Sequence, residues 1–272
     1  MPTIVDKERA VALLRDEFGE IADLGSTLDE RAWNTPTCLP GWTVKDNLSH
    51  MVGTESALAG EAMPTVDLPD LDYIHNDIAK LNEQWVASMR PVPGHEVLER
   101  FRSVTRDRLA ELDAMTQAGF DAPSWTPAGP DETYGRFMRI RHYDCFLHEH
   151  DMRLAVGTAD RTDVEPLRFA LEEVLPALGY AVGRKAAMPK GSRVRIRLTG
   201  ALDDEILVAV DDRAAVVSEL DGAPTVGIQL PVMLFFRLTG GRTDAESHRD
   251  EITVEGDAAL AMQLASNLAF TI

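Results

Sequence analysis

A polar stripe within an apolar helical pattern is the feature that most constrains how this chain folds. In the segment RHYDCFLHEHDMR, a rotation of about 100° per residue places four polar side chains within roughly 80° of one helix face. These residues are Arg141, Asp144, His148 and Asp151. Because charged side chains are rarely buried unless they are paired or bind a metal, the direction in which this stripe points decides what the chain can do.

The residues around the stripe indicate that it faces the core. Two apolar rows flank it, whereas the opposite side of the helix is polar and is expected in solvent. The apolar rows are Ile140–Leu147–Leu154 and Met138–Cys145–Met152, and the expected solvent side is His142, Glu149, His150 and Arg153. The sequence therefore predicts a carboxylate and an imidazole inside the protein, one helical turn apart.

Length and composition set limits on the rest of the chain. The 272 residues are 44% hydrophobic, which is enough for a large core and for two domains. No apolar run approaches the ~18 residues of a membrane span, and the charged N-terminus is unlike a signal peptide. We therefore expect a cytoplasmic protein in which Cys38 and Cys145 are reduced thiols. A net charge of −18 argues against nucleic acid and anionic membranes as partners.

The first half of the chain has helical periodicity interrupted by loops. We expect helices at 5–28, 44–63, 73–89 and 96–115, followed by the helix that carries the stripe. Thr43 is the predicted N-cap of the second helix, with Asp46 in the position of a capping box. Long amphipathic helices joined by loops are typical of an up-and-down helical bundle, whose interior often holds metal sites.

The pattern changes after Gly157 to short β-rich runs between helices. We expect helices at 165–183, 231–238 and 257–268, and strands at 193–198, 205–210, 214–220, 225–230 and 251–254. This order predicts an α+β fold with a mainly antiparallel sheet. The boundary falls between Gly157 and Glu165, which divides the chain into predicted domains at 1–160 and 161–272.

Asp144 and His148 are the core of a candidate metal site. Side chains at positions i and i+4 of a helix can converge on one ion, and a catalytic zinc site often uses two histidines and a carboxylate. His50 is the best candidate for the second histidine, because Gly53 and Ala57 beside it would let another helix approach closely. A buried hydrogen-bonded network of arginine, aspartate and histidine is the alternative interpretation.

Two motifs in this chain resemble a known family. The segment 33–50, WNTPTCLPGWTVKDNLSH, and the later pattern R-x-x-D-x-x-x-H-x-x-D at 141–151 are similar to the mycothiol-dependent maleylpyruvate isomerase family of DinB-like metal-binding four-helix bundles. The segments LTGGR and GDAALAMQLASN resemble the small α+β C-terminal domain of that family. The resemblance implies a divalent metal, usually zinc, held by His50, Asp144 and His148. The departure is Asp144, where the family more often has glutamate.

The resemblance also implies roles for residues around the ligands. Asp151 is expected to orient His148 or to pair with Arg141, although a plain ion pair between helices would explain both residues equally well. Arg237 and Arg242 lie where the second domain of the family supplies a basic residue toward the cleft. Either arginine could act in catalysis by binding a substrate carboxylate, and solvent-exposed arginines are the alternative.

The cysteines and tryptophans near the two motifs are interpreted without a catalytic role. Cys38 lies in a loop and Cys145 in an apolar row, so neither is the expected nucleophile, although Cys145 could approach the metal. Trp33 and Trp42 are interpreted as core anchors at the junction of the loop and the second helix.

By resemblance, the leading functional hypothesis is a metalloenzyme that uses mycothiol as a thiol cosubstrate. The metal would lower the pKa of the thiol, and the thiolate would attack a small electrophilic substrate. We rank S-transfer above cis–trans isomerisation of a maleylpyruvate-like compound. The alternatives are a non-haem iron oxygenase, a metal-dependent hydrolase that uses bound water, and a non-catalytic metal-containing binding protein.

Overall fold

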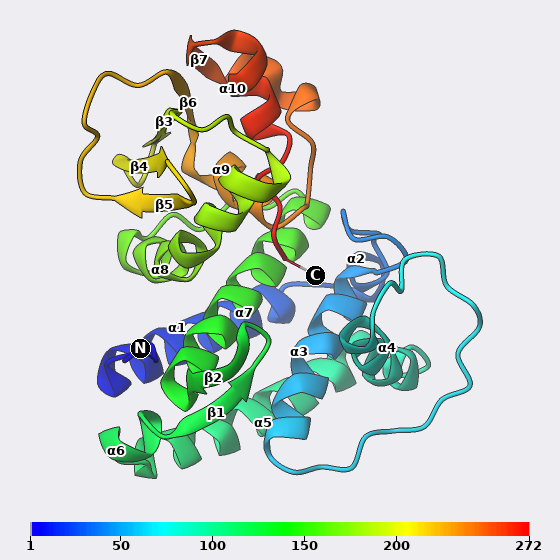
Figure 1. Ribbon diagram of the computed structural model, residues 1–272. Coiled ribbons are helices and arrows are strands. Elements are labelled where there is room, and N and C mark those ends of the chain that lie inside the picture. Colours follow the sequence, from blue (N-terminus) through cyan, green and yellow to red (C-terminus); the bar gives the residue numbers. More distant parts are fainter. Residues whose placement is uncertain (1, 272) are drawn as a thin grey trace. The chain divides into compact units, whose positions relative to one another are not determined.

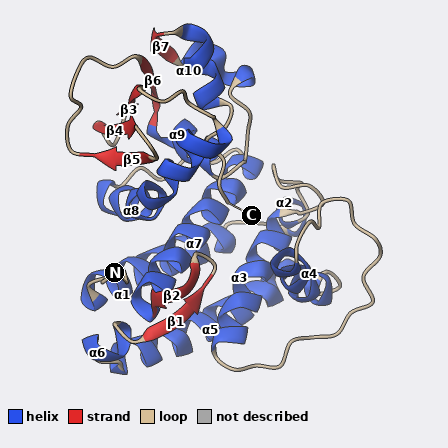
Figure 2. Cartoon of the chain, viewed as in Figure 1, coloured by secondary structure: helices blue, strands red, loops and turns tan. Residues whose placement is uncertain are grey.

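The computed structural model describes residues 2–271 and divides into two compact units, of which the first ends at Arg161 and the second begins at Thr162. The first unit is mainly helical, and the second combines helices with a sheet (Figure 1; Figure 2). The predicted α+β class is confirmed. That each unit is an independent domain stays a prediction. Within the described residues, no helix is both long enough and apolar enough to cross a membrane.

Seven helices and one hairpin make up the described part of the first unit. The helices are α1 Lys7–Ser26, α2 Glu30–Trp33, α3 Val44–Leu58, α4 Asp77–Met89, α5 Gly94–Ala114, α6 Gln117–Phe120 and α7 Tyr134–Val156, and the hairpin is β1 Pro123–Thr126 with β2 Gly129–Thr133. The long helices α1, α3, α5 and α7 form a ring, because α1 and α3 each pack against both α5 and α7. Figure 1 shows α7 running between α1 and α3.

Local signals fix where these helices begin and end. The predicted capping box of α3 is present: the Thr43 hydroxyl accepts from the Asp46 amide, and the Asp46 carboxylate accepts from the Thr43 amide at 2.9 Å. The Thr133 side chain caps α7 by accepting from the Arg136 amide, and the C-cap of α7 is Gly157, whose φ of +73° few other residues tolerate. The hairpin β1–β2 precedes α7 in a segment for which the sequence pattern predicted no strand.

The prediction that one side of α7 faces solvent is wrong. His142 and Glu149 are fully buried and His150 is 3% exposed. Helix α1 covers this side, where Arg161 pairs with Glu149 at 3.2 Å and also with Glu17. Burial and the neighbouring Glu149 raise the pKa of Glu17 well above its usual range. A pattern read along one helix cannot separate a solvated polar face from one whose charges are neutralised by distant residues.

The apolar rows beside the stripe are only partly buried. Met138, Cys145, Leu147 and Met152 lie in the core, as expected. Leu154, in the last turn of α7, is 51% exposed. In the stripe itself, Arg141, His148 and Asp151 are buried, as predicted, whereas Asp144 is partly exposed.

The second unit is a five-stranded sheet with helices packed on its strands. Its elements are α8 Val164–Tyr180, a π-helical turn Ala181–Lys185, β3 Arg193–Thr199, β4 Asp204–Val210, β5 Ala214–Val217, β6 Val226–Pro231, α9 Val232–Thr239, a 3₁₀ turn Glu246–Glu251, β7 Thr253–Gly256 and α10 Ala258–Ala265. The strand order is β5-β4-β3-β6-β7, and only the β3–β6 pair is parallel. The prediction of a mainly antiparallel sheet is confirmed.

Gly53 brings α4 close to α3. A Cβ added at this position would overlap Cβ and Cγ of Trp85 on α4. Gly19 on α1, in contrast, is exposed and has no atom within 4 Å of such a Cβ. Alanine at position 19 therefore tests helix propensity alone, whereas alanine at position 53 also tests the steric cost of a Cβ.

We expect Gly53→Ala to lower the free energy of unfolding by about 1–3 kcal/mol, because overpacking outweighs the better helix propensity. Gly19→Ala should raise it by about 0.5–1 kcal/mol. Urea unfolding of both variants at 25 °C checks this pair, and equal shifts in the two variants would contradict the close approach of α3 and α4.

Candidate metal centre

His50 of α3 and Asp144 and His148 of α7 converge on one point. The His50 Nε2 lies 3.1 Å from Asp144 Oδ2, and His148 Nε2 lies 3.6 Å from Asp144 Oδ1. The three candidate ligand atoms all lie within 4.8 Å of one another. Both imidazoles are 5% exposed, whereas the Asp144 side chain is 31% exposed, so solvent reaches the centre at the carboxylate. Two imidazole nitrogens and a carboxylate oxygen are a donor set that suits zinc.

Asn47 determines which nitrogen of His148 faces the centre. Its amide NH₂ donates to the Thr43 carbonyl at 2.9 Å and to the Thr37 hydroxyl at 3.3 Å, so its carbonyl oxygen faces His148 Nδ1 at 2.7 Å. Because a carbonyl oxygen only accepts, Nδ1 carries the proton and Nε2 offers its lone pair. Sequence reasoning missed Asn47. Its place one turn before His50 in the predicted second helix was the available signal.

Trp42 lies against both imidazoles. Its ring centroid is 5.4 Å from that of His50 and 5.9 Å from that of His148. Its indole N–H donates to Glu83 at 3.0 Å, and the ring is only half-buried. Trp33 lies in the core, as expected, but Trp42 instead forms an aromatic wall beside the candidate ligands.

Glu83 of α4 connects this wall to the loop that precedes α4. Its second oxygen accepts from the Tyr73 hydroxyl at 3.2 Å and pairs with Arg90 at 2.6 Å. The Tyr73 ring lies against Gly41, whose φ of +76° allows the turn before Trp42 and whose missing Cβ leaves room for the ring. Loop, turn and tryptophan are thus held by one buried carboxylate.

The charges of the centre set its protonation state. Burial raises the pKa of Asp144, but His50, Arg141 and His148 outweigh this effect and hold that pKa well below its usual range. Burial lowers the pKa of His50, although the nearby Asp144 opposes this shift. At neutral pH the carboxylate is therefore charged and His50 is neutral, which are the forms that bind a metal.

A comparison with protein families identifies the sequence independently of this geometry. Residues 14–153 match the model described as the mycothiol maleylpyruvate isomerase N-terminal domain. The chain belongs to this family. The resemblance inferred from the two motifs is confirmed, and the matched segment contains all three candidate ligands. A comparison with curated protein sequences finds no match.

Solved structures show the same fold over nearly the whole chain. The crystal structure of the mycothiol-dependent maleylpyruvate isomerase matches with a TM-score of 0.60 and 15% identity, covering 95% of this chain and 98% of that one. A mutant of the mycothiol-dependent maleylpyruvate isomerase matches with a TM-score of 0.56, at the same identity and coverage. At this level of identity the likeness shows the fold alone.

The other stripe residues lie beside the candidate ligands of this isomerase-family protein. Arg141 contacts the Asp144 carboxylate and donates to Glu55 at 3.0 Å. Asp151 Oδ2 lies 3.3 Å from His148 Nδ1. Its other oxygen accepts from the Cys38 thiol at 3.2 Å. The contact of Asp151 agrees with a role in orienting His148, and this role stays a prediction.

Arg237 and Arg242 belong to the second unit. Arg237 lies in the last turn of α9, and Arg242 follows the Gly240-Gly241 break and donates to the Gly240 carbonyl at 2.6 Å. Both are half-buried. Their assignment as catalytic residues of the isomerase-family fold stays a prediction.

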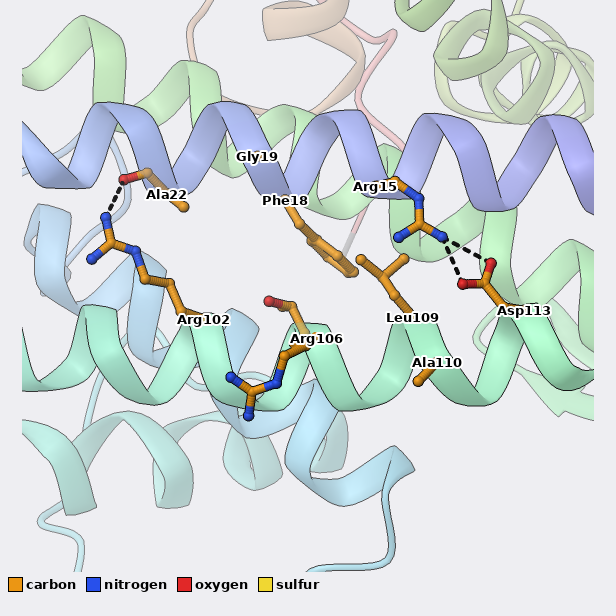
Figure 3. Close-up of a pocket in the computed structure, with 10 residues that line it drawn as sticks. Arg15, Phe18, Gly19, Ala22, Arg102, Arg106, Leu109, Ala110 and Asp113 are labelled. Atoms are coloured by element: carbon orange, nitrogen blue, oxygen red, sulfur yellow. Dashed lines mark hydrogen bonds and ion pairs between the residues drawn. The ribbon is translucent and has the colours of Figure 1, made fainter.

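A groove between α1 and α5 in this helical unit is not a second candidate site. It encloses about 450 Å³, and Figure 3 shows Arg15 paired with Asp113 at one end and Arg102 reaching a backbone carbonyl at the other. Phe18 and Leu109 of its floor are only 4% and 8% exposed, so a ligand would find little apolar surface left to bury.

Neither cysteine resembles an activated nucleophile, and the two differ sharply in exposure. Cys38 is exposed, whereas Cys145 is buried and its sulfur accepts from Arg141 at 3.4 Å. Burial raises the pKa of Cys145 well above its usual range, although Arg141 opposes the shift. A buried thiol that stays protonated is unreactive.

We expect iodoacetamide to modify Cys38 in the native protein at least about 100-fold faster than Cys145, because only an accessible thiolate reacts. Peptide mass mapping over time measures both rates. Cys38→Ser should remove the fast reaction, and rapid labelling of Cys145 in the folded protein would contradict its burial.

Proposed function

We propose that this protein is a cytoplasmic metalloenzyme that uses mycothiol as a thiol cosubstrate and that His50, Asp144 and His148 hold a divalent ion, zinc by its donor set. The convergence of His50, Asp144 and His148, with a charged carboxylate and a neutral His50, is the observation that carries the proposal. A zinc ion bound there would lower the pKa of a neighbouring thiol, so that the thiolate is present at neutral pH.

The residues around the triad support thiol chemistry with an external thiol. Asn47 holds His148 in one tautomer, and the partly exposed Asp144 marks the side from which small molecules enter. Trp42 offers a flat apolar wall that excludes water from one side of the imidazoles. Cys145 is buried and stays protonated, and Cys38 lies in a loop and donates a hydrogen bond to Asp151, so we assign the nucleophile to an external thiol.

Two reactions would use the same thiolate. In S-transfer, the thiolate sulfur forms a bond to an electrophilic carbon. Either a leaving group departs from that carbon with the electrons of its bond, or the π electron pair of a conjugated double bond moves away from it and the adjacent carbon takes up a proton. In isomerisation, the thiolate adds to a conjugated double bond, the resulting single bond rotates, and elimination returns the thiolate. We propose S-transfer to a small electrophile, and the named activity of the family supports isomerisation at least as strongly.

Metal binding tests the triad directly. We expect His148→Ala to weaken zinc binding at least about 100-fold, because a direct ligand contributes more than a residue behind it. His95→Ala is the matched control, because His95 is exposed on α5. Elemental analysis and zinc titration of untagged protein measure both variants. Equal zinc content in the two variants would remove the triad as the binding site.

Thiol dependence tests the reaction class. We expect mycothiol to stabilise the zinc-loaded protein by about 2.7 kcal/mol at a concentration of 100 Kd, and glutathione to do so far less. Turnover without added thiol would favour a hydrolase, and zinc binding without thiol binding would favour a non-catalytic protein. Mass analysis then distinguishes a thioether product from an isomer of unchanged mass.

A basic residue of the second unit is expected to bind the polar part of the substrate or thiol. Arg242→Ala, or failing that Arg237→Ala, should lower kcat/KM by one to a few powers of ten, about 1.5–4 kcal/mol, with zinc content unchanged. Lysine at the same position should restore only part of the lost kcat/KM, because lysine lacks the planar two-donor group of arginine. Wild-type kinetics in both alanine variants would rule out this role.

A further inference from the structure

A buried network of ion pairs connects Asp144 to the core of the helical unit. Arg141 contacts Asp144 and donates through Nε to Glu55 of α3 at 3.0 Å. Arg108 of α5 donates to the other oxygen of Glu55 at 3.3 Å. The side chains of Arg108, Arg141 and Glu55 are only 3–4% exposed, so solvent does little to screen their charges.

The two arginines depend on Glu55 to different extents. Arg108 also donates to the Tyr134 hydroxyl at 2.7 Å and pairs with Glu111, whose side chain is 54% exposed. Arg141 has Asp144 and Glu55 as its only carboxylate partners among residues 2–271. Without Glu55, the guanidinium of Arg141 would therefore be neutralised by Asp144 alone.

This dependence matters because Asp144 is the only charged group in the triad. A guanidinium that relies entirely on Asp144 would cancel its charge and compete with a cation for its oxygens. With Glu55 in place, and with the charge of Arg108 also offset by Glu111, the three residues Glu55, Arg141 and Asp144 together carry one negative charge. A divalent cation held by two neutral imidazoles and Asp144 needs that remaining negative charge.

We propose that Glu55 is a positioning residue for the metal centre: it holds Arg141 and neutralises its charge, so that Asp144 stays available to the divalent cation. The inference rests on the proposed function, since it concerns the same triad. A merely structural role, in which Glu55 ties α3 to α5 and α7, makes a different prediction. It would lower stability when Glu55 is changed, without any dependence of metal affinity on Arg141.

The first comparison uses two glutamate variants. Glu55→Gln keeps an acceptor oxygen but removes the charge, and Glu111→Gln removes the exposed partner of Arg108 as a matched control. We expect zinc affinity, measured by titration against a competing chelator, to fall about 10- to 100-fold in Glu55→Gln. Glu111→Gln should stay within about twofold of wild type, because its carboxylate contacts neither Arg141 nor Asp144.

The second comparison removes the arginine as well. Arg141→Met should bind zinc at least as tightly as wild type, and the double variant Glu55→Gln/Arg141→Met should return to within a few-fold of wild type. Such rescue is not expected from a structural role, since the double variant loses more contacts than either single one. Thermal unfolding of each apo variant records stability separately from affinity.

The outcomes separate this inference from the proposed function. Wild-type protein that binds no zinc overturns both. The role of Glu55 alone is overturned if wild-type protein binds zinc and Glu55→Gln binds it equally tightly. It is also overturned if the double variant binds zinc as weakly as Glu55→Gln. If Glu55→Gln fails to fold, the zinc affinity of Arg141→Met still tests the proposal. Weaker zinc binding in that variant than in wild type contradicts it.

Discussion

Charge buried on both sides of α7 is the constraint on which the helical unit depends. On one side Glu55 pairs with Arg141, and on the other Arg161 pairs with Glu17 and Glu149. Breaking a buried ion pair leaves an uncompensated charge, which costs several kcal/mol of free energy. Separating the elements that cover α7 from this helix is therefore strongly unfavourable. Ion pairs as well as apolar packing therefore hold the candidate metal ligands in place.

Much of this arrangement could be predicted from the sequence, and the failures share one cause. The helical spacing of the stripe and the capping box at Thr43 are local signals, and the sequence pattern therefore located α7 and the start of α3 correctly. Whether His142 and Glu149 face solvent depends on Arg161 and α1, which a pattern along α7 does not contain. The hairpin β1–β2 was missed because short, proline-containing strands have no clear alternation.

The candidate site shows the same division between local and distant signals. Asp144 and His148 share one helix, so their spacing alone suggested a common ion, whereas His50 was chosen from the small residues beside it and from the family motif. Asn47 was missed and Trp42 was assigned to the core, because their roles depend on the side-chain directions of other elements. Residues that orient ligands are harder to predict than ligands, because common polar and aromatic residues can fill such positions in many ways.

The contact of Tyr73 with Gly41 links a long loop of this unit to the aromatic wall beside the candidate ligands. The loop between α3 and α4, drawn as a long coil in Figure 2, carries Tyr73, whose hydroxyl donates to the same Glu83 carboxylate that accepts from the indole of Trp42. Loops tolerate insertion and substitution far better than helices do. Evolution therefore has a route to reshape the entrance of this centre, and with it the range of molecules admitted, while the three ligands stay as they are.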